Sequence, residues 1–363
     1  MLSIQSISVF QYKNYPAGSW QFHEKVVGIS GKNGVGKTNL LDAVYFCCFT
    51  KSYFSRNDAQ LVLQGAQGMR VAGEFLRNGE PYSVAGLIRE TGKKEFRVNG
   101  LPCEKMADHI GHLPALVVAP DDVEIITGAS EERRRFMDQL FSQLDHEYLL
   151  QLMTYNRLLQ QRNSLLRQIG ETGRQQPELL DVLDSQLAGP ANYVFSRRKH
   201  YLETLVTTAL RRYSGISGES YSPELVYESP LLETDMLQCL RLNRQRDLAA
   251  QRTTSGIHRD DLAFQLNEGP FRQIASQGQR KSLLFALKLA AFDMLKQFNG
   301  FAPLLLLDDV FEKLDENRMS NLLTEVCVAN DGQVLITDTH PERIKKSLER
   351  LLNGFQLIEL GRS

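Results

Sequence analysis

The stretch GKNGVGKT at residues 31–38 decides the fold class of this chain. It matches the pattern G-x-x-x-x-G-K-[ST], follows the apolar run Val26–Ile29 and precedes a second apolar run at 38–49. A strand, a glycine-rich turn and a helix in this order predict backbone N–H groups that surround phosphate oxygens, helped by the helix N-terminus. We expect Lys37 to reach the outer phosphates and Thr38 to offer its hydroxyl to Mg²⁺. The predicted binding residues are Gly31, Lys32, Asn33, Gly34, Val35, Gly36, Lys37 and Thr38. The alternative is a simple turn before a helix, which the flanking strand and helix disfavour.

A second motif supplies the carboxylates that such a site needs. Pro303–Leu307 contains four leucines in a row, which predicts a buried strand, and Asp308 and Asp309 follow it directly. Ligands of α/β sheets lie at the carboxyl ends of the strands. We expect Asp308 to hold Mg²⁺ and Asp309 to orient the attacking water. A strand that ends in a solvated acidic turn is the alternative.

Three weaker signals follow in the last third of the chain. Ser276, Gln277, Gly278 and Gln279 precede a helix at 279–298, so a serine cap and a glycine predict a second anion-binding helix N-terminus. Asp315 lies shortly after the acidic pair, and His340 follows a predicted strand at 333–337. Taken singly, Ser276 could be only a helix cap and His340 only a structural residue.

Composition fits a globular protein that carries one inserted lobe. The 363 residues are 42% apolar and 23% charged, with a net charge of -1 and five cysteines without metal-binding spacing, which favours a reducing cytoplasm. We expect no signal peptide, no membrane span and no membrane partner. Strand patterns fill the first third, helical patterns at 130–169, 178–213 and 231–253 fill the middle, and α/β patterns return near 262. The expected organisation is a head at 1–128 and 254–363 with a helical lobe at 129–253.

Together the motifs resemble the set that defines the ABC ATPases: P-loop, signature, acidic strand, D-loop and switch histidine. The resemblance implies an α/β fold with mixed sheets around the P-loop helix. It also implies that ATP binds between the P-loop of one chain and the signature of another, with Mg²⁺ at Thr38 and Asp308, Asp315 in the D-loop, and Asp309 and His340 as catalytic residues. A P-loop covers one side of a triphosphate, so a second helix N-terminus is needed to stabilise the negative charge of the phosphates on the other side. Each chain has one of each motif, which predicts a homodimer with two-fold symmetry.

Further stretches resemble the RecF family along most of the chain. They are Gly31–Ala43, Val117–Gly128 with Arg133–Asp138, Gln161–Leu166, Gly256–Asp261, Ala275–Ala290 and Leu306–Asp315. The resemblance implies a DNA-stimulated, weak ATPase of recombinational repair, replication restart and the SOS response. Its implied partners are double-stranded and gapped DNA and the proteins RecO and RecR, with which it helps to load RecA.

Two other function classes remain open alternatives. A transport ATPase subunit would share the P-loop, but the divergent signature and the β-rich segment at 70–98 disfavour it. A chromosome-tethering or nuclease protein would need a long coiled coil or a metal-nuclease cluster, and the sequence indicates neither.

Basic residues provide the candidate DNA contacts. These are Arg56, Arg133, Arg134, Arg197, Arg198 and Lys199. Clusters of this kind suit sequence-independent contact with phosphates. The alternative is a solvated helix face, or ion pairs between the 133–135 cluster and nearby acids such as Glu131, Glu132 and Asp138.

Overall fold

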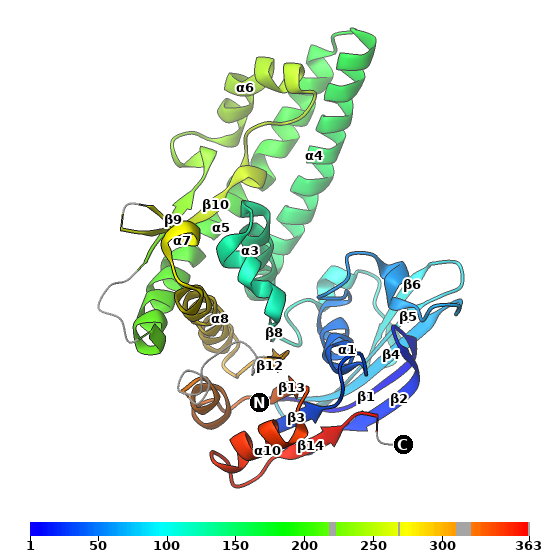
Figure 1. Ribbon diagram of the computed structural model, residues 1–363. Helices are drawn as coiled ribbons and strands as arrows, with labels where there is room; N and C mark the ends of the chain where they lie inside the picture. The colour runs from blue at the N-terminus through cyan, green and yellow to red at the C-terminus, as the bar shows by residue number, and fades with distance from the viewer. Residues whose placement is uncertain (218–222, 268, 310–320, 362–363) are drawn as a thin grey trace. The chain divides into compact units, whose positions relative to one another are not determined.

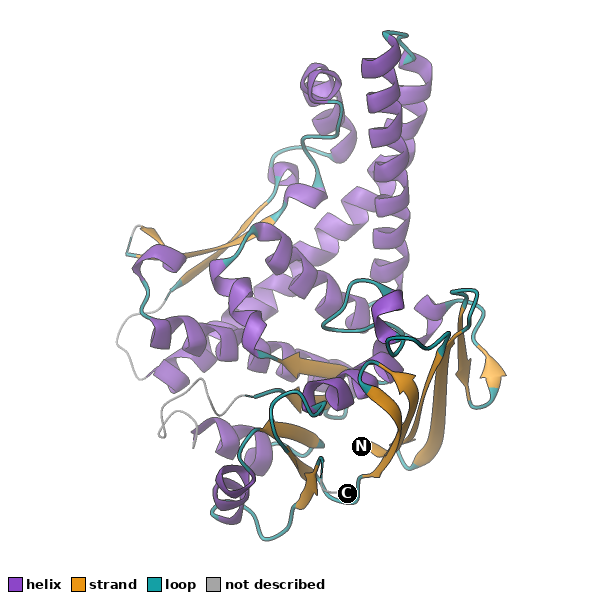
Figure 2. Ribbon diagram, turned by 45° about the vertical axis from the view of Figure 1, so that its right-hand side comes forward, coloured by secondary structure: helices purple, strands orange, loops and turns teal. Residues whose placement is uncertain are grey.

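The computed structural model describes residues 1–217, 223–267, 269–309 and 321–361 and confirms the α/β class. The chain forms two compact units. Unit 1 contains Met1–Asp122 and Lys288–Ser363, and unit 2 contains Val123–Leu287. Most strands belong to the first unit and most long helices to the second, and Figure 2 shows strands in orange and helices in purple. Segment 254–287, which the sequence places with the head, is grouped in unit 2, where its strand β10 (Asp261–Leu266) pairs with β9 (Glu224–Glu228).

A five-stranded parallel sheet forms the centre of unit 1. Its strand order is β14 (Gln356–Glu359), β3 (Val26–Ser30), β13 (Val334–Asp338), β12 (Leu304–Leu307) and β8 (Ala115–Val118). The residues of β3, β8, β12 and β13 are all buried, as expected for strands whose sequences are mostly apolar. In the register of this sheet Leu307 pairs with Ile336, and Asp338 pairs with Ser30. The loops that follow β3, β12 and β13 therefore leave the sheet at the same edge.

A six-stranded antiparallel sheet forms the second layer of unit 1. Its order is β2 (Tyr15–Gln21), β1 (Leu2–Tyr12), β4 (Met69–Arg77), β5 (Glu80–Ile88), β6 (Lys94–Val98) and β7 (Leu101–Pro102). Hairpin turns lie at Asn78-Gly79 and Asn99-Gly100, where both residues of each turn have positive φ. The strand patterns in the sequence do not identify β2 or β8.

Helix α1 (Lys37–Phe49) joins the two sheets, and Figure 1 shows it beside the strands of both. Eleven of its thirteen residues are buried, so it has no polar face of the kind a surface helix shows. Its one acidic residue, Asp42, has no exposed surface. The Asp42 carboxylate accepts hydrogen bonds from the hydroxyls of Tyr12 and Ser52, each at 2.7 Å, and lies 2.5 Å from Lys13 Nζ. The buried charge is therefore fully compensated, and it fixes α1 against the β1–β2 hairpin.

A buried ion pair lies where the chain leaves and re-enters unit 1. Asp122 is the last residue before unit 2 and Lys288, on helix α8 (Gln277–Asn299), is the first after it. Lys288 Nζ lies 3.0 Å from Asp122 Oδ2 and donates to Val117 O at 2.8 Å. The hydroxyl of Tyr53 also donates to Asp122. The two chain crossings are thus held together by charge.

The remaining elements are short, apart from the helices of unit 2. In unit 1 they are η1 (Asp58–Leu61), η2 (Met106–His109), a π-helical turn at Thr324–Ala329, α10 (Pro341–Glu349) and η3 (Pro120–Val123), whose last residue is the first of unit 2. In unit 2 they are α2 (Glu124–Thr127), η4 (Pro230–Leu232), η5 (Ile257–Arg259), β11 (Gly269–Pro270) and α7 (Phe271–Ile274).

Unit 2 is built on four helices, α3 (Ser130–Leu144), α4 (His146–Thr172), α5 (Pro177–Ser217) and α6 (Met236–Ala250). Figure 1 shows α4 as a long rod, and it packs along α5. The prediction of one helix at 130–169 was wrong. Asp145 has extended backbone dihedrals and interrupts the helix, and its side chain accepts from Tyr148 N and so caps α4. The first of the two helices, α3, begins at Ser130, directly after its N-cap residue Ala129.

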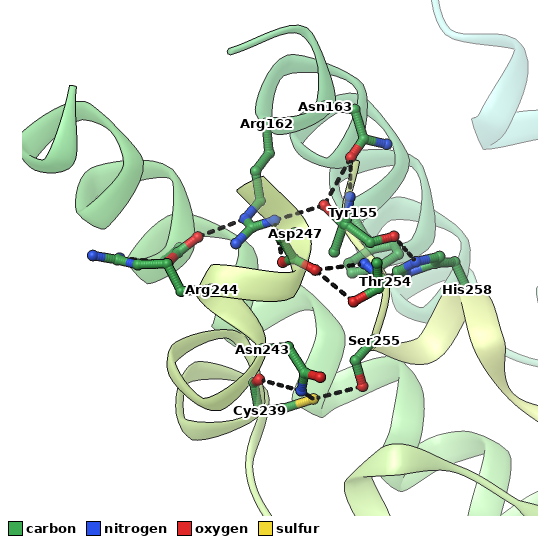
Figure 3. A network of polar contacts seen from close by, with 12 residues as sticks. Tyr155, Arg162, Asn163, Cys239, Asn243, Arg244, Asp247, Thr254, Ser255 and His258 are labelled. Carbon is green, nitrogen blue, oxygen red and sulfur yellow. Dashed lines mark hydrogen bonds and ion pairs between the residues drawn. The ribbon is translucent and has the colours of Figure 1, made fainter. Parts of the chain in front are cut away.

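A buried polar network holds α4, α5 and α6 together (Figure 3). Arg162 has no exposed surface and donates to Asp184 at 2.6 Å and to Asp247 and Thr253 at 2.7 and 2.8 Å. Asp247 also accepts from the amide and the hydroxyl of Thr254. Arg162 of α4 therefore holds the start of segment 253–261 together with α5 and α6.

His258 extends this network toward α4. Burial lowers the pKa of His258 to about 4, so its ring is neutral at physiological pH. Nε2 lies 3.1 Å from Thr253 O, which can only accept, so the proton is on Nε2 and Nδ1 accepts from Tyr155 OH at 2.6 Å. This histidine has a structural role.

No helix within the described ranges is long and apolar enough to cross a membrane.

We predict that Arg162→Met lowers the free energy of unfolding by about 3–5 kcal/mol, because it leaves the buried carboxylate of Asp247 without a cation and leaves Asp184 with Arg244 alone. Urea denaturation measures this. Arg167→Met is the matched control on the exposed face of α4 and should change stability by less than about 0.5 kcal/mol. Equal stability of the two variants would contradict the assigned role.

Candidate functional site

The predicted phosphate-binding loop lies at the carboxyl end of β3. The strand ends at Ser30 and α1 begins at Lys37, so the loop opens directly into a helix N-terminus. Gly34 and Gly36 have φ of +79° and +115°, which side chains rarely adopt. A Cβ at Gly36 would also lie 2.6 Å from the hydroxyl of Tyr15. Lys37 is buried and donates to the carbonyl of Gly31 at 3.0 Å, so its ammonium group crosses the loop.

The β1–β2 hairpin braces this loop, a feature that the sequence analysis missed. Tyr15 OH donates to Gly36 O at 2.9 Å, and Asn14 Nδ2 donates to Val35 O at 3.0 Å. Asn39, on the first turn of α1, donates in turn to Asn14 at 2.7 Å. The curvature of the loop is therefore set by side chains from outside the motif, and only the motif itself is visible as a pattern in the sequence.

The predicted metal ligands, Thr38 and Asp308, lie together in unit 1. Thr38 Oγ1 is 3.0 and 2.9 Å from the two carboxylate oxygens of Asp308. Thr337, at the end of β13, donates its hydroxyl to Asp308 Oδ1 at 2.8 Å. Three strands thus bring two hydroxyls and one carboxylate to one point at the edge of the parallel sheet.

This donor set has the chemistry of a hard-cation site. Burial raises the pKa of Asp308, and hydrogen bonds from Thr337 and Thr38 act in the opposite direction. Mg²⁺ takes oxygen ligands and is bound in phosphate sites by one or two protein oxygens together with the phosphates and water. Thr38 and Asp308 fit that requirement.

Asp309 follows in a strained backbone conformation. Its φ of +44° is unusual for a residue other than glycine, and its amide donates to the hydroxyl of Thr337 at 2.9 Å. Such backbone strain persists where the surrounding structure enforces it, often at functional sites. The water-orienting role of Asp309 stays a prediction.

Ser276 lies immediately before α8 and forms a reciprocal cap with Gln279. Its hydroxyl accepts from Gln279 N at 3.2 Å, and its own amide donates to Gln279 Oε1 at 2.7 Å. Ser276 and Gln277 are exposed and Gly278 is partly exposed, so this helix N-terminus can be approached by an anion. Contact with ATP in a second chain stays a prediction.

His340 stands at the carboxyl end of the parallel sheet, two residues after β13. Its side chain is 68% exposed, and Nδ1 lies 2.8 Å from the hydroxyl of Thr339. The predicted D-loop residue Asp315 lies outside the described residues.

The structure corrects two of the predicted DNA contacts, Arg133 and Arg198. Arg133 is buried and pairs with Asp261 at 2.6 Å. Arg198 is 1% exposed and pairs with Asp138 and Asp260 at 2.8 and 2.7 Å. Their guanidinium groups are used inside unit 2 and cannot reach a phosphate in this conformation.

The other candidate contacts differ in exposure. Arg134 is half-buried and donates to Asp260 O at 2.6 Å, and Arg197 pairs with Asp145 at 2.8 Å with its side chain 35% exposed. Lys199 and Arg56 are exposed. The alternative of internal ion pairs therefore applies to Arg133, Arg197 and Arg198. Within the 133–135 cluster, Arg135 pairs with Glu131 and Glu132 of its own helix, whereas Arg133 pairs with the distant Asp261.

Comparison with known proteins gives a consistent result. The model of the RecF/RecN/SMC N terminal domain matches residues 3–357. The DNA replication and repair protein RecF of Flavobacterium johnsoniae is 37% identical over 99% of this chain and 100% of its own length. RecF of Phocaeicola vulgatus is 38% identical over 98% of this chain and 95% of its own length.

Solved structures agree with the sequence comparison. The structure of the recombination mediator protein RecF-ATP in the RecFOR pathway has a TM-score of 0.86 and 29% identity, and the match covers 93% of this chain and 92% of that one. The Smc head domain of Pyrococcus furiosus has a TM-score of 0.56 at 15% identity over 99% of this chain and 94% of that one, which shows a shared fold alone.

Adjacent residues on α5 test the correction of the DNA contacts. We predict that Arg198→Gln lowers the free energy of unfolding by about 3 kcal/mol or more, since it leaves Asp138 and Asp260 without their cation. Lys199→Gln removes an exposed charge and should change stability by less than about 0.5 kcal/mol. Urea denaturation of both variants measures this, and a fully stable Arg198→Gln protein would contradict the buried role.

Proposed function

The chain belongs to the RecF family of DNA replication and repair proteins, within the RecF/RecN/SMC group of ABC-type ATPases, and we propose that it is an ATP-driven switch on DNA. ATP closes two copies of the chain around two nucleotides. The closed dimer holds double-stranded DNA next to a single-stranded gap, and slow, DNA-stimulated hydrolysis reopens it. The dimer acts in the cytoplasm with RecO and RecR to help load RecA.

The observation that carries this proposal is the contact between Thr38 and Asp308. The hydroxyl that follows the P-loop lysine and the carboxylate that follows β12 are 2.9 Å apart, at the strand ends where a triphosphate would be bound. Gly31–Thr38 would surround the phosphates, and Lys37 would turn from the Gly31 carbonyl toward them. Mg²⁺ held by Thr38 and Asp308 would neutralise charge on the phosphates.

Dimer closure follows from what one P-loop leaves uncovered. The backbone donors of Gly31–Thr38 approach the triphosphate from one side, so the other side needs a further set of donors. Ser276 and the first amides of α8 provide an exposed, capped helix N-terminus of suitable chemistry. Two-fold symmetry would place this terminus of each chain on the nucleotide of its partner. A solved relative is described as RecF-ATP, which supports ATP as the nucleotide.

DNA contact is proposed at residues that remain exposed. Lys199 on α5 and Arg56 after α1 are the strongest candidates among the six basic residues predicted to contact DNA, because both are exposed. Arg197 and Arg134 are partly accessible and would contribute less. Contacts of this kind bind phosphates without reading sequence, so affinity should fall with salt.

We predict that Lys37→Met abolishes ATP binding and, with it, ATP-dependent dimerisation. The buried ammonium group supplies the positive charge of the loop, and methionine has the length but not the charge. Fluorescent-nucleotide titration measures binding, and sedimentation velocity measures mass. Retained ATP binding would show that Gly31–Thr38 is not the nucleotide site.

We predict that Ser276→Arg binds ATP normally but stays monomeric, because the side chain fills the surface that would face the partner's nucleotide. Asp309→Asn should bind ATP and remain a closed dimer, because the carboxylate proposed to orient the attacking water is lost. Sedimentation with ATP and with a gapped duplex should therefore show a monomer for Ser276→Arg and a persistent dimer for Asp309→Asn. ATP-dependent mass doubling by Ser276→Arg would refute the contact in trans.

A further inference from the structure

An ion pair with a buried carboxylate lies directly beside His340, and the sequence motifs do not include it. Asp338 is the last residue of β13 and 1% exposed, and in the sheet it pairs with Ser30, the residue before the phosphate-binding loop. Arg343, on the first turn of α10, donates from Nε to Asp338 Oδ2 at 2.8 Å and from Nη2 to Oδ1 at 2.5 Å. This is the two-pronged geometry that makes arginine–carboxylate pairs strong and directional.

The same carboxylate holds the backbone that carries the histidine. Oδ1 of Asp338 accepts the amide of His340 at 3.1 Å and lies 3.4 Å from the Thr339 hydroxyl. His340 is the N-cap residue of α10 and offers no side-chain cap to the helix. Asp338 therefore fixes the position of the turn between β13 and α10, and Arg343 fixes Asp338.

The ring of His340 is oriented by its neighbour. The Thr339 hydroxyl lies 2.8 Å from Nδ1, so Nε2 is the ring nitrogen that can meet a ligand. The Thr339 hydroxyl contacts both the Asp338 carboxylate and the His340 ring, so the orientation of the ring depends on the position of the carboxylate. The path from Arg343 to the ring thus runs through Asp338 and Thr339, and it consists of three hydrogen-bond contacts within unit 1.

Arg343 also compensates the negative charge of Asp338. A buried carboxylate without a cation is costly, and here it would stand next to the proposed triphosphate site, where further negative charge would oppose binding. Arg343 neutralises Asp338 so that the turn can be held by a carboxylate at this place in the sheet.

We infer that Arg343 is a positioning residue for His340, acting through the Asp338 carboxylate. The inference rests on the proposed function for the catalytic meaning of His340, but the placement of the ring can be tested without any turnover. Arg343 would contact neither ATP nor the attacking water. Its loss would leave the nucleotide site complete and displace only the histidine.

The first experiment observes the ring itself. The Hε1–Cε1 NMR signal of His340, assigned by its loss in His340→Gln, should shift in Arg343→Met and stay in place in Lys346→Met, a control on the exposed face of the same helix. Arg343→Lys keeps the charge but not the two-pronged contact and should give an intermediate shift. An unshifted signal in Arg343→Met would overturn the inference.

The second experiment measures coupling in ATP turnover. Arg343→Met should lower kcat about ten- to a hundredfold with a less than twofold change in KM. This is expected when the His340 ring is moved slightly out of position while ATP binding is unchanged. Added to His340→Ala, the same change should have no further effect on kcat, because Arg343 acts only through that ring. An equal additional loss in the double variant would overturn the inference.

Two further results separate the possible failures. If Arg343→Met does not fold, Arg343→Met with Asp338→Asn removes both charges, and a shifted His340 signal in that variant supports the inference while an unshifted one overturns it. If His340→Ala hydrolyses ATP at the wild-type rate, the catalytic role in the proposed function fails. The NMR signal then still decides whether Arg343 places the ring.

Discussion

The contact between the Thr38 hydroxyl and the Asp308 carboxylate is the constraint on which the rest of the structure depends. The two residues are 270 positions apart in the sequence and meet because β13 lies between β3 and β12 in the parallel sheet. Thr337, the residue of β13 between them, bonds to both Asp308 and the amide of Asp309. A shift of one strand by one residue would separate the phosphate loop from its carboxylate and turn the side chains of that strand to the other face.

Three buried carboxylates of unit 1, those of Asp42, Asp122 and Asp338, each have a cationic partner that holds a neighbouring element. Asp42 ties α1 to the β1–β2 hairpin through Tyr12 and Lys13. Asp338 ties β13 to α10 through Arg343, and Asp122 ties the two chain crossings through Lys288. A site that must accept a polyanion needs its own negative charges neutralised, and these pairs achieve that while fixing geometry.

The sequence predicts the parts of the site that have local patterns, and it fails where the partner is distant. Gly31–Thr38, Asp308 and the strands around them follow from motif and apolar run, because each depends on neighbours in the chain. The arginine clusters could not be assigned, because a basic run looks the same whether it is exposed or paired, and Arg133 meets Asp261 only through tertiary packing. The break at Asp145 is not visible in the sequence because a single extended residue leaves the apolar periodicity of both helices almost unchanged.

The order of strands in the parallel sheet has a consequence for biosynthesis. β3 carries the phosphate loop, and both of its neighbours in the sheet, β13 and β14, come from residues 334–359. As the ribosome extends the chain, the loop therefore emerges long before the strands that flank it, whereas Val123–Leu287 form a contiguous unit that can fold in the meantime. The nucleotide site closes over a long intervening segment, which slows its formation. A nascent chain thus cannot complete the proposed nucleotide site until nearly all of its sequence has been translated.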